Sequence, residues 1–136
     1  MKVLVKGLKE TEELAKNFAA ELIGGEVVLL NGDLGAGKTT FTQFVFAALG
    51  VKEVVNSPTF AILKSYQGKF KLHHFDTYRI TFEEAIEAGF DEIFNERDSI
   101  IFVEWSENIS PLLPEKTIKV NIKCINENER EFEIIK

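Results

Sequence analysis

The sequence predicts an α/β fold, in which helices flank a mixed β-sheet within a single domain that spans residues 1–136. Three observations point to this class. An apolar run at 26–31 leads through a glycine-rich turn into a helical segment at 39–49, a second apolar run occupies 99–103, and the C-terminal part alternates apolar and polar residues. Buried strands appear as apolar runs and half-buried strands alternate, so both kinds are expected, with helices packed on the sheet.

The N-terminal half is predicted to contain two strands and two helices. Residues 3–6 alternate as in a short strand, and residues 26–31 form a buried one. Thr11 is predicted to cap the first helix, because two glutamates would follow it in the first turn. The glycine pair at 24–25 would end that helix, and the second helix covers 39–49.

The C-terminal half is predicted to contain five strands and one short helix. The strands are expected at 60–66, 69–75, 99–103, 117–125 and 131–135. The first two would form a hairpin around Gln67 and Gly68, and the last two a closing antiparallel hairpin. Thr81 is predicted to cap a short helix that runs through Ala88, because two glutamates lie in its first turn.

Composition narrows the classes of function. A net charge of −6 disfavours direct binding of nucleic acid, because that affinity comes mainly from lysines and arginines that neutralise phosphates. No apolar run approaches the length of a membrane span, and the N-terminus lacks the apolar core of a signal peptide. The single cysteine, Cys124, excludes an internal disulfide, indicates a reducing compartment and is expected to be a buried thiol within a strand. We therefore expect a cytoplasmic protein.

Residues 32–39 read Gly-Asp-Leu-Gly-Ala-Gly-Lys-Thr and match the phosphate-binding loop pattern G-x-x-x-x-G-K-[ST]. The predicted strand before the loop and the predicted helix after it are the context that such a loop requires. Gly35 and Gly37 would let backbone N–H groups point at phosphate oxygens, at the positive end of the helix dipole. Lys38 would reach the β- and γ-phosphates, and the Thr39 hydroxyl would bind Mg²⁺. The loop predicts a nucleoside triphosphate site on a P-loop NTPase-type fold.

A second acidic group is expected near Mg²⁺, at the carboxyl end of a neighbouring strand. Glu104 directly follows the apolar residues 100–103 and fits this position, although Asp is the usual residue there. Its longer side chain could ligate Mg²⁺ or orient water. Trp105 is expected to pack beside the site or to shield it.

Polar side chains also gather at the end of the first predicted hairpin. His74, Asp76 and Tyr78 would share one face of an extended chain, so His74 and Asp76 could position water or sense the γ-phosphate. For His73 and His74 the alternative is a polar edge with a partly buried ring. Arg79 could pair with an acidic neighbour or with phosphate.

Thr59 lies in a predicted loop at 56–59, between the second helix and the first hairpin. A threonine in this place can contact Mg²⁺ or the γ-phosphate and order the loop, as in nucleotide switches. The alternative is a β-branched residue that opens the next strand.

Four motifs occur in order along the chain: Gly-Asp-Leu-Gly-Ala-Gly-Lys-Thr-Thr at 32–40, Ser-Pro-Thr-Phe at 57–60, His-Phe-Asp-Thr-Tyr-Arg at 74–79 and Val-Glu-Trp at 103–105. Together, and at this spacing, they resemble the bacterial TsaE (YjeE) family over nearly the whole chain. The loop alone is generic, whereas the third and fourth motifs in combination are specific to that family.

The resemblance implies a small P-loop ATPase that uses ATP and Mg²⁺ and is required for threonylcarbamoyladenosine formation in tRNA, on the adenosine beside the anticodon. Members act with TsaD, which transfers the threonylcarbamoyl group, and with TsaB, the partner of TsaD. Their ATP hydrolysis would reset the TsaD–TsaB complex between turnovers. An acidic chain fits a protein that reaches tRNA only through these partners.

The resemblance also implies roles for individual residues. Nucleotide binding is implied for Thr11, Asp33, Leu34, Gly35, Ala36, Gly37, Lys38, Thr39 and Thr40. Catalysis is implied for Lys38, Asp76 and Glu104, with Asp76 near the metal and the attacking water, and Mg²⁺ ligation for Thr39 and Glu104. Switch or sensor roles are expected among Thr59, His74, Tyr78, Arg79 and Trp105.

Other classes of function remain open from the residues alone. A small-molecule kinase usually needs an arginine-bearing lid, and of the three arginines Arg97 and Arg130 lie outside lid-like segments. In a nucleotide-gated binding module, hydrolysis would be incidental. A regulatory GTPase is disfavoured, because the guanine motif N-K-x-D and a D-x-x-G switch after the second core strand are missing. The scarcity of arginines leads us to expect weak ATPase activity in the isolated chain, with a partner surface completing the site.

Overall fold

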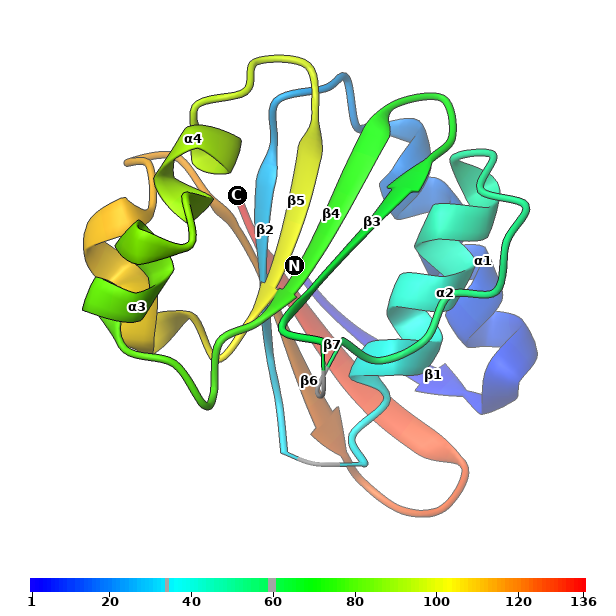
Figure 1. The fold of residues 1–136 in the computed structure, drawn as a ribbon. Helices are drawn as coiled ribbons and strands as arrows, with labels where there is room; N and C mark the ends of the chain where they lie inside the picture. The colour runs from blue at the N-terminus through cyan, green and yellow to red at the C-terminus, as the bar shows by residue number, and fades with distance from the viewer. Residues whose placement is uncertain (34, 59–60) are drawn as a thin grey trace.

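The computed structural model describes residues 1–33, 35–58 and 61–136 (Figure 1). Its strands are β1 (Lys2–Lys6), β2 (Val27–Asn31), β3 (Leu63–Gln67), β4 (Lys71–Asp76), β5 (Ile100–Glu104), β6 (Ile118–Cys124) and β7 (Glu129–Ile135). Its helices are α1 (Gly7–Ala20), α2 (Lys38–Ala48), α3 (Phe82–Glu87), α4 (Phe90–Phe94) and the 3₁₀ segment η1 (Ser106–Leu112). Figure 1 shows α1 and α2 on one face of the sheet and α3, α4 and η1 on the other. Among the described helices, none is long and apolar enough to cross a membrane.

The sheet has parallel strands at its centre. Within the described residues its seven strands lie in the order β1-β7-β6-β2-β5-β4-β3, in which β2 pairs in parallel with β5 and β6, and β5 with β4. The outer pairs β1–β7, β6–β7 and β3–β4 are antiparallel. Because parallel strands run the same way, β2, β4 and β5 end at one edge, where Leu30 and Asp76 both lie opposite Glu104. Open α/β sheets bind their ligands at this edge.

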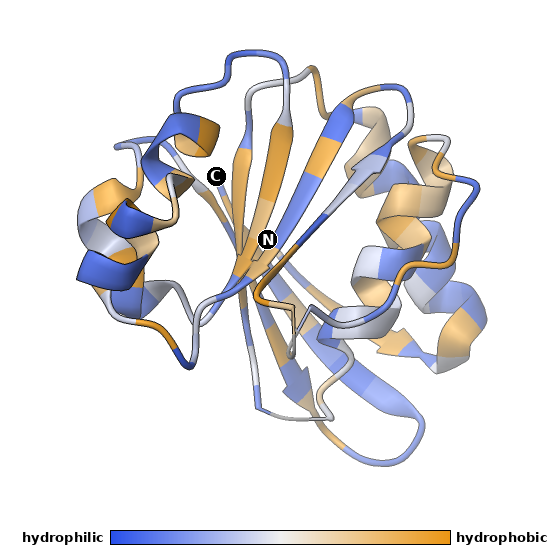
Figure 2. Cartoon of the chain, viewed as in Figure 1, coloured by the Kyte–Doolittle hydropathy of each residue, from blue (hydrophilic) through white to orange (hydrophobic). Residues whose placement is uncertain are grey.

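Alternation along β2 divides the core into two apolar clusters. Val28 and Leu30 pack with α1 and α2 on one face, whereas Val27 and Leu29 pack with residues of β4, α3 and α4 on the other. In Figure 2 the central strands β2 and β5 are mostly apolar, and hydrophilic residues concentrate on the loops and on the outer surfaces of the helices. This packing holds α2 against the sheet and thereby sets where the phosphate loop must end.

The predicted α/β class, its mixed sheet and both hairpins are confirmed. Thr81 caps α3 as expected: its hydroxyl accepts the N–H of Glu84, and the Glu84 carboxylate accepts the N–H of Thr81. The sequence does not predict α4 and η1. Both are too short for a helical repeat of apolar residues to show, and η1 contains Pro111.

Two expectations about the ends of α1 are wrong. Thr11 is not the N-cap, because the helix begins at Gly7 and Thr11 Oγ1 donates to the Gly7 carbonyl at 3.1 Å. Glu10 instead accepts the N–H of Lys6 at 2.8 Å, which satisfies the helix start directly after β1. The helix also ends at Ala20, before the glycine pair.

Cys124 is exposed, so the expectation of a buried thiol is also wrong. It is the last residue of β6, and pairing of β6 with β2 stops at Asn121. The end of β6 therefore extends, paired with β7, beyond the end of β2. There, alternation along the strand no longer implies burial.

Candidate nucleotide-binding site

The phosphate loop joins β2 to α2 at the carboxyl edge of the sheet. Gly37 immediately precedes α2 with φ +110°, a left-handed conformation that favours glycine. Gly32 is needed for a different reason, because a Cβ there would lie 2.7 Å from the Ile122 carbonyl oxygen. The free N–H groups at the start of α2 and the positive end of its dipole favour anion binding at this turn.

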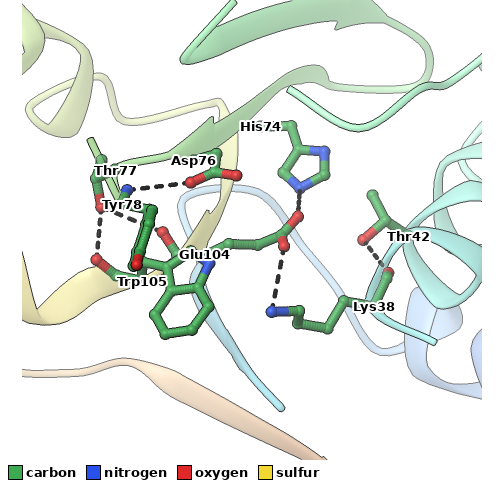
Figure 3. Close-up of polar contacts among 8 residues, drawn as sticks. All are labelled: Lys38, Thr42, His74, Asp76, Thr77, Tyr78, Glu104 and Trp105. Atoms are coloured by element: carbon green, nitrogen blue, oxygen red, sulfur yellow. Dashed lines mark hydrogen bonds and ion pairs between the residues drawn. The ribbon is translucent and has the colours of Figure 1, made fainter. Parts of the chain in front are cut away.

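Lys38 is buried, and its ammonium contacts two groups at the end of β5 (Figure 3). Its Nζ lies 3.6 Å from Glu104 Oε1 and 4.8 Å from the centre of the Trp105 ring. The latter is a cation–π contact, in which the indole face attracts the ammonium. Trp105 has φ +60°, a backbone conformation that is uncommon for a bulky residue and that concentrates at functional sites.

Glu104 is buried at the end of β5, and its two carboxylate oxygens have different partners. His74 Nε2–H donates to Oε2 at 2.7 Å, whereas Oε1 faces Lys38. Burial favours the neutral acid, but the hydrogen bond from His74 and the charge of Lys38 outweigh it and hold the pKa of Glu104 below its usual value. At neutral pH Glu104 is therefore a carboxylate, the form that binds metal ions.

Asp76 is buried at the end of β4, directly beside Glu104. Its Oδ1 accepts the N–H of Tyr78 at 3.0 Å, which turns the chain out of the strand. Thr77 ties this turn to the end of β5, because its hydroxyl lies 2.6 Å from the carbonyl oxygen of Trp105 and 3.1 Å from that of Glu104. Two motifs that are far apart in the sequence thus form one hydrogen-bonded unit.

A cavity of 610 Å³, the phosphate cavity, lies between the loop and this unit. The predicted residues that line it are Asp33, Gly35, Gly37, Lys38, Thr39, Thr40, Asp76, Tyr78, Arg79, Glu104 and Trp105. Tyr78 and Arg79 form an exposed rim, whereas the charged groups of Lys38, Asp76 and Glu104 are buried. The volume is in the range typical of small-molecule sites.

A smaller cavity of 210 Å³, the hairpin cavity, adjoins the first at Gly37 and Thr40, which line both. Thr11 and Ala36, two further residues of the predicted nucleotide-binding set, line it. Arg130 from β7 also lines it, and its Nε donates to the Ala36 carbonyl at 3.2 Å. Sequence reasoning misses Arg130 because its hairpin carries no motif; the scarcity of arginines is the one signal that could have drawn attention to it.

His74 is placed differently from the other predicted site residues. It has no exposed surface and is bonded to Glu104, so direct contact with water or phosphate in the cavity is not open to it. The alternative of a partly buried edge is wrong for both histidines, because His73 is 2% and His74 0% exposed. Leu34 and Thr59 lie outside the described residues.

Comparison with known proteins places this arrangement in a family. A family model described as "Threonylcarbamoyl adenosine biosynthesis protein TsaE" matches residues 5–132. This chain belongs to the TsaE family. The match spans the phosphate loop, the ends of β4 and β5, and Arg130.

Individual TsaE relatives agree with this assignment. The proteins named tRNA threonylcarbamoyladenosine biosynthesis protein TsaE from Bacillus subtilis and Rickettsia prowazekii are 43% and 45% identical over 125 residues each. The alignments cover 91% of this chain and 78% of the first relative, and 90% of this chain and 85% of the second. The crystal structure of Bacillus subtilis YdiB matches with a TM-score of 0.81 at 37% identity, over 97% of this chain and 82% of that one. The fold is therefore a P-loop fold shared with this family.

The donors of this TsaE chain fit a Mg²⁺ ion that is shared with phosphates. Glu104, Asp76 and Thr39 place two carboxylates and a hydroxyl around one cavity. No group of three or more His, Cys, Asp or Glu side chains that could hold a metal ion occurs in the described part of the chain. Mg²⁺ in phosphate-transfer sites is usually bound through one or two carboxylates together with substrate phosphates, which matches this donor set.

Proposed function

We propose that this chain is a Mg²⁺-dependent ATPase required for threonylcarbamoyladenosine formation in tRNA, on the adenosine next to the anticodon. The observation that carries the proposal is the pairing of the phosphate-loop lysine, Lys38, with Glu104 at 3.6 Å in a cavity lined by the loop and by the ends of β4 and β5. The relatives supply the pathway, because they are named for it. The chain would act in the cytoplasm as one domain and reach tRNA only through TsaD and TsaB.

In this proposal the side chains of the phosphate cavity divide the work of phosphoryl transfer. The loop amides and Lys38 hold the β- and γ-phosphates, and Thr39 and Glu104 ligate Mg²⁺. The bound metal ion would supply positive charge to the phosphate oxygens. Asp76 lies buried beside Glu104 and would hold the attacking water. Because buried charges are weakly screened, this arrangement supplies the positioning and electrostatic stabilisation on which phosphoryl transfer depends.

The hairpin cavity is proposed to take the base and ribose of ATP. It meets the phosphate cavity at Gly37 and Thr40, so a nucleotide held by the loop can extend into it. Thr11 of α1 and Arg130 of β7 lie on its walls. The bond from Arg130 to the Ala36 carbonyl braces the loop from this side.

A partner surface is proposed to complete the site at its rim. Tyr78 and Arg79 are exposed next to the buried phosphate cluster, where a docked protein can reach them. Tyr78 packs against Trp105 with ring centres 4.9 Å apart, and Trp105 in turn contacts Lys38. A change of the nucleotide bound at Lys38 would therefore alter the packing of Trp105 and Tyr78 at the rim. In our proposal TsaD and TsaB dock there, and ATP hydrolysis resets their complex between turnovers.

The test is ATP hydrolysis by the purified chain, alone and with purified TsaD and TsaB, measured together with threonylcarbamoyladenosine formation on tRNA. We expect slow hydrolysis by the chain alone, faster hydrolysis with the partners, and tRNA modification that depends on the chain. Equal rates with and without partners would contradict completion of the site by a partner. A phosphorylated small molecule among the products would favour a kinase instead, and full tRNA modification by a variant that binds ATP without hydrolysing it would favour a nucleotide-gated module.

A further inference from the structure

Two adjacent histidines of β4 are both buried but have different partners. Neighbouring residues of a strand point to opposite faces of the sheet. His73 is hydrogen-bonded to Ser65 at 2.7 Å and to Glu96 at 2.9 Å, neither of which lines the phosphate cavity. His74 is hydrogen-bonded to Glu104, which does line it, at 2.7 Å. The chain therefore contains an internal control for the role of a buried histidine at this site.

The surroundings of His74 single out its bond to Glu104. The ring packs against Phe46 of α2 in an edge-on arrangement, with centroids 6.1 Å apart. Its Nδ1 has no hydrogen-bond partner within the described residues. Burying a polar ring that is satisfied at one nitrogen costs free energy, and an apolar side chain would avoid that cost. The hydrogen bond to Glu104 is the contribution of His74 that an apolar side chain could not make.

We propose that His74 is a positioning residue that holds the Glu104 carboxylate in place for Mg²⁺; this inference rests on the proposed function. Glutamate has three rotatable side-chain bonds, so a carboxylate in this position needs a restraint that the shorter aspartate needs less. The Nε2–H of His74 restrains Oε2 and leaves Oε1 facing Lys38, as Figure 3 shows. When nucleotide phosphates attract the lysine, Oε1 becomes available as a metal ligand without reorientation of the side chain.

The expected effect follows from how such partners act elsewhere. Groups that hydrogen-bond to metal ligands typically change metal affinity about 10- to 100-fold. His74 has no exposed surface, so it does not touch the nucleotide itself. Loss of its hydrogen bond should therefore weaken the contribution of Mg²⁺ to nucleotide binding and leave metal-free binding unchanged.

Two variants of equal side-chain length separate the hydrogen bond from packing: H74Q keeps an N–H donor, and H74M does not. Calorimetric titration with ADP, in Mg²⁺ and in EDTA, measures the gain in affinity that the metal provides. We expect this gain to fall about 10- to 100-fold in H74M and to recover largely in H74Q. The matched control H73M should keep the gain of the wild type, and the affinity in EDTA should be the same for all four proteins.

The outcomes distinguish the inference from the function on which it rests. Equal gains in H74M and H74Q, or a wild-type gain in H74M, would overturn the role of His74 and leave the nucleotide site intact. A wild type that binds ADP equally well in Mg²⁺ and in EDTA would overturn the proposed Mg²⁺ site, and the role of His74 with it. If circular dichroism shows that H74M is unfolded, H74N replaces it with the same expectation, because its shorter amide removes the donor from the position of Nε2.

Discussion

The two cavities that meet at Gly37 and Thr40 are built in different ways. The phosphate cavity gathers buried charged groups, Lys38, Asp76 and Glu104, from three sequence motifs. The hairpin cavity is lined by the loop residues Ala36, Gly37 and Thr40 and otherwise by parts of α1 and of the β6–β7 hairpin that carry no motif. In our proposal this difference arises because phosphoryl chemistry demands particular charges at particular places, whereas a surface for the flat ring of the base demands mainly shape, which many sequences can provide.

The largest effect is expected from removing the lysine of the phosphate cavity. K38A should lower ATP hydrolysis about 100-fold or more, because the loss of a charged donor at a phosphoryl site costs a few kcal/mol of transition-state stabilisation. Threonylcarbamoyladenosine formation should fall with it. Steady-state hydrolysis in the presence of TsaD and TsaB measures the effect, and K52A, at an exposed lysine after α2, is the control. Equal rates for K38A and K52A would remove the lysine from the site.

The two carboxylates of the same cavity should affect turnover and binding differently. D76A and E104A are each expected to lower hydrolysis about 100-fold, because in our proposal these groups act on the attacking water and on the metal. D76A should change ADP affinity much less, whereas E104A should also remove the gain in ADP affinity that Mg²⁺ provides and leave the affinity in EDTA unchanged. Chelation of Mg²⁺ with EDTA should reduce wild-type hydrolysis to the level of E104A. Turnover numbers and calorimetric binding constants together provide the check. Wild-type activity of either variant in the assembled system would exclude that residue from catalysis.

The contrast between the cavities also explains what could be predicted from the sequence. Glu104 was predictable, because a charged residue directly after a buried apolar run marks the edge where ligands of such sheets bind. Arg130 was not, because its place beside Ala36 depends on the long-range pairing of β6 with β2. Asn108 was not predictable either, because it lies in η1, which the sequence does not predict. Its amide donates to the Thr77 carbonyl at 2.8 Å and supports the hydrogen-bonded unit that Thr77 forms with Glu104 and Trp105.

Thr11 illustrates the same limit in a different way. It lines the hairpin cavity together with Ala36 and Gly37 of the loop, yet the cap pattern that was read at this residue is wrong. Helix starts depend on which side chain reaches the free N–H groups, and here Glu10 does so. Local patterns describe the elements well but their ends poorly.

A smaller effect is expected in the hairpin cavity. R130A should weaken ATP binding about 5- to 10-fold, which corresponds to the loss of one hydrogen bond to the loop worth about 1 kcal/mol. Turnover at saturating ATP should change little, since Arg130 braces the loop away from Asp76 and Glu104, the carboxylates proposed to act in catalysis. Michaelis constants and turnover numbers measured for R130A and K38A sharpen the comparison. A drop in turnover as large as that of K38A would place Arg130 in catalysis and contradict the proposed division of roles between the two cavities.

The smallest effect is on stability in acid and concerns the buried charge of the phosphate cavity. The pKa of Glu104 is lowered in the folded state from an ordinary value of 4.5, so folding favours the carboxylate. Its contribution to the free energy of unfolding is therefore fully present above pH 4.5 and is lost as the pH falls through the lower, folded-state pKa. We expect the wild type to be more stable than E104Q near neutral pH, and the difference to narrow below pH 4.5.

Glu96 provides the control for this effect, because it is also bonded to a buried histidine. The hydrogen bond from His73 is the main cause that lowers the pKa of Glu96, but its side chain is 36% exposed and solvent screens the interaction. The difference in stability between the wild type and E96Q should therefore depend less on pH than the difference for E104Q. Urea denaturation at about pH 6 and about pH 3 measures both differences. A constant gap between the wild type and E104Q across this range would show that Glu104 contributes by its shape and not by its charge.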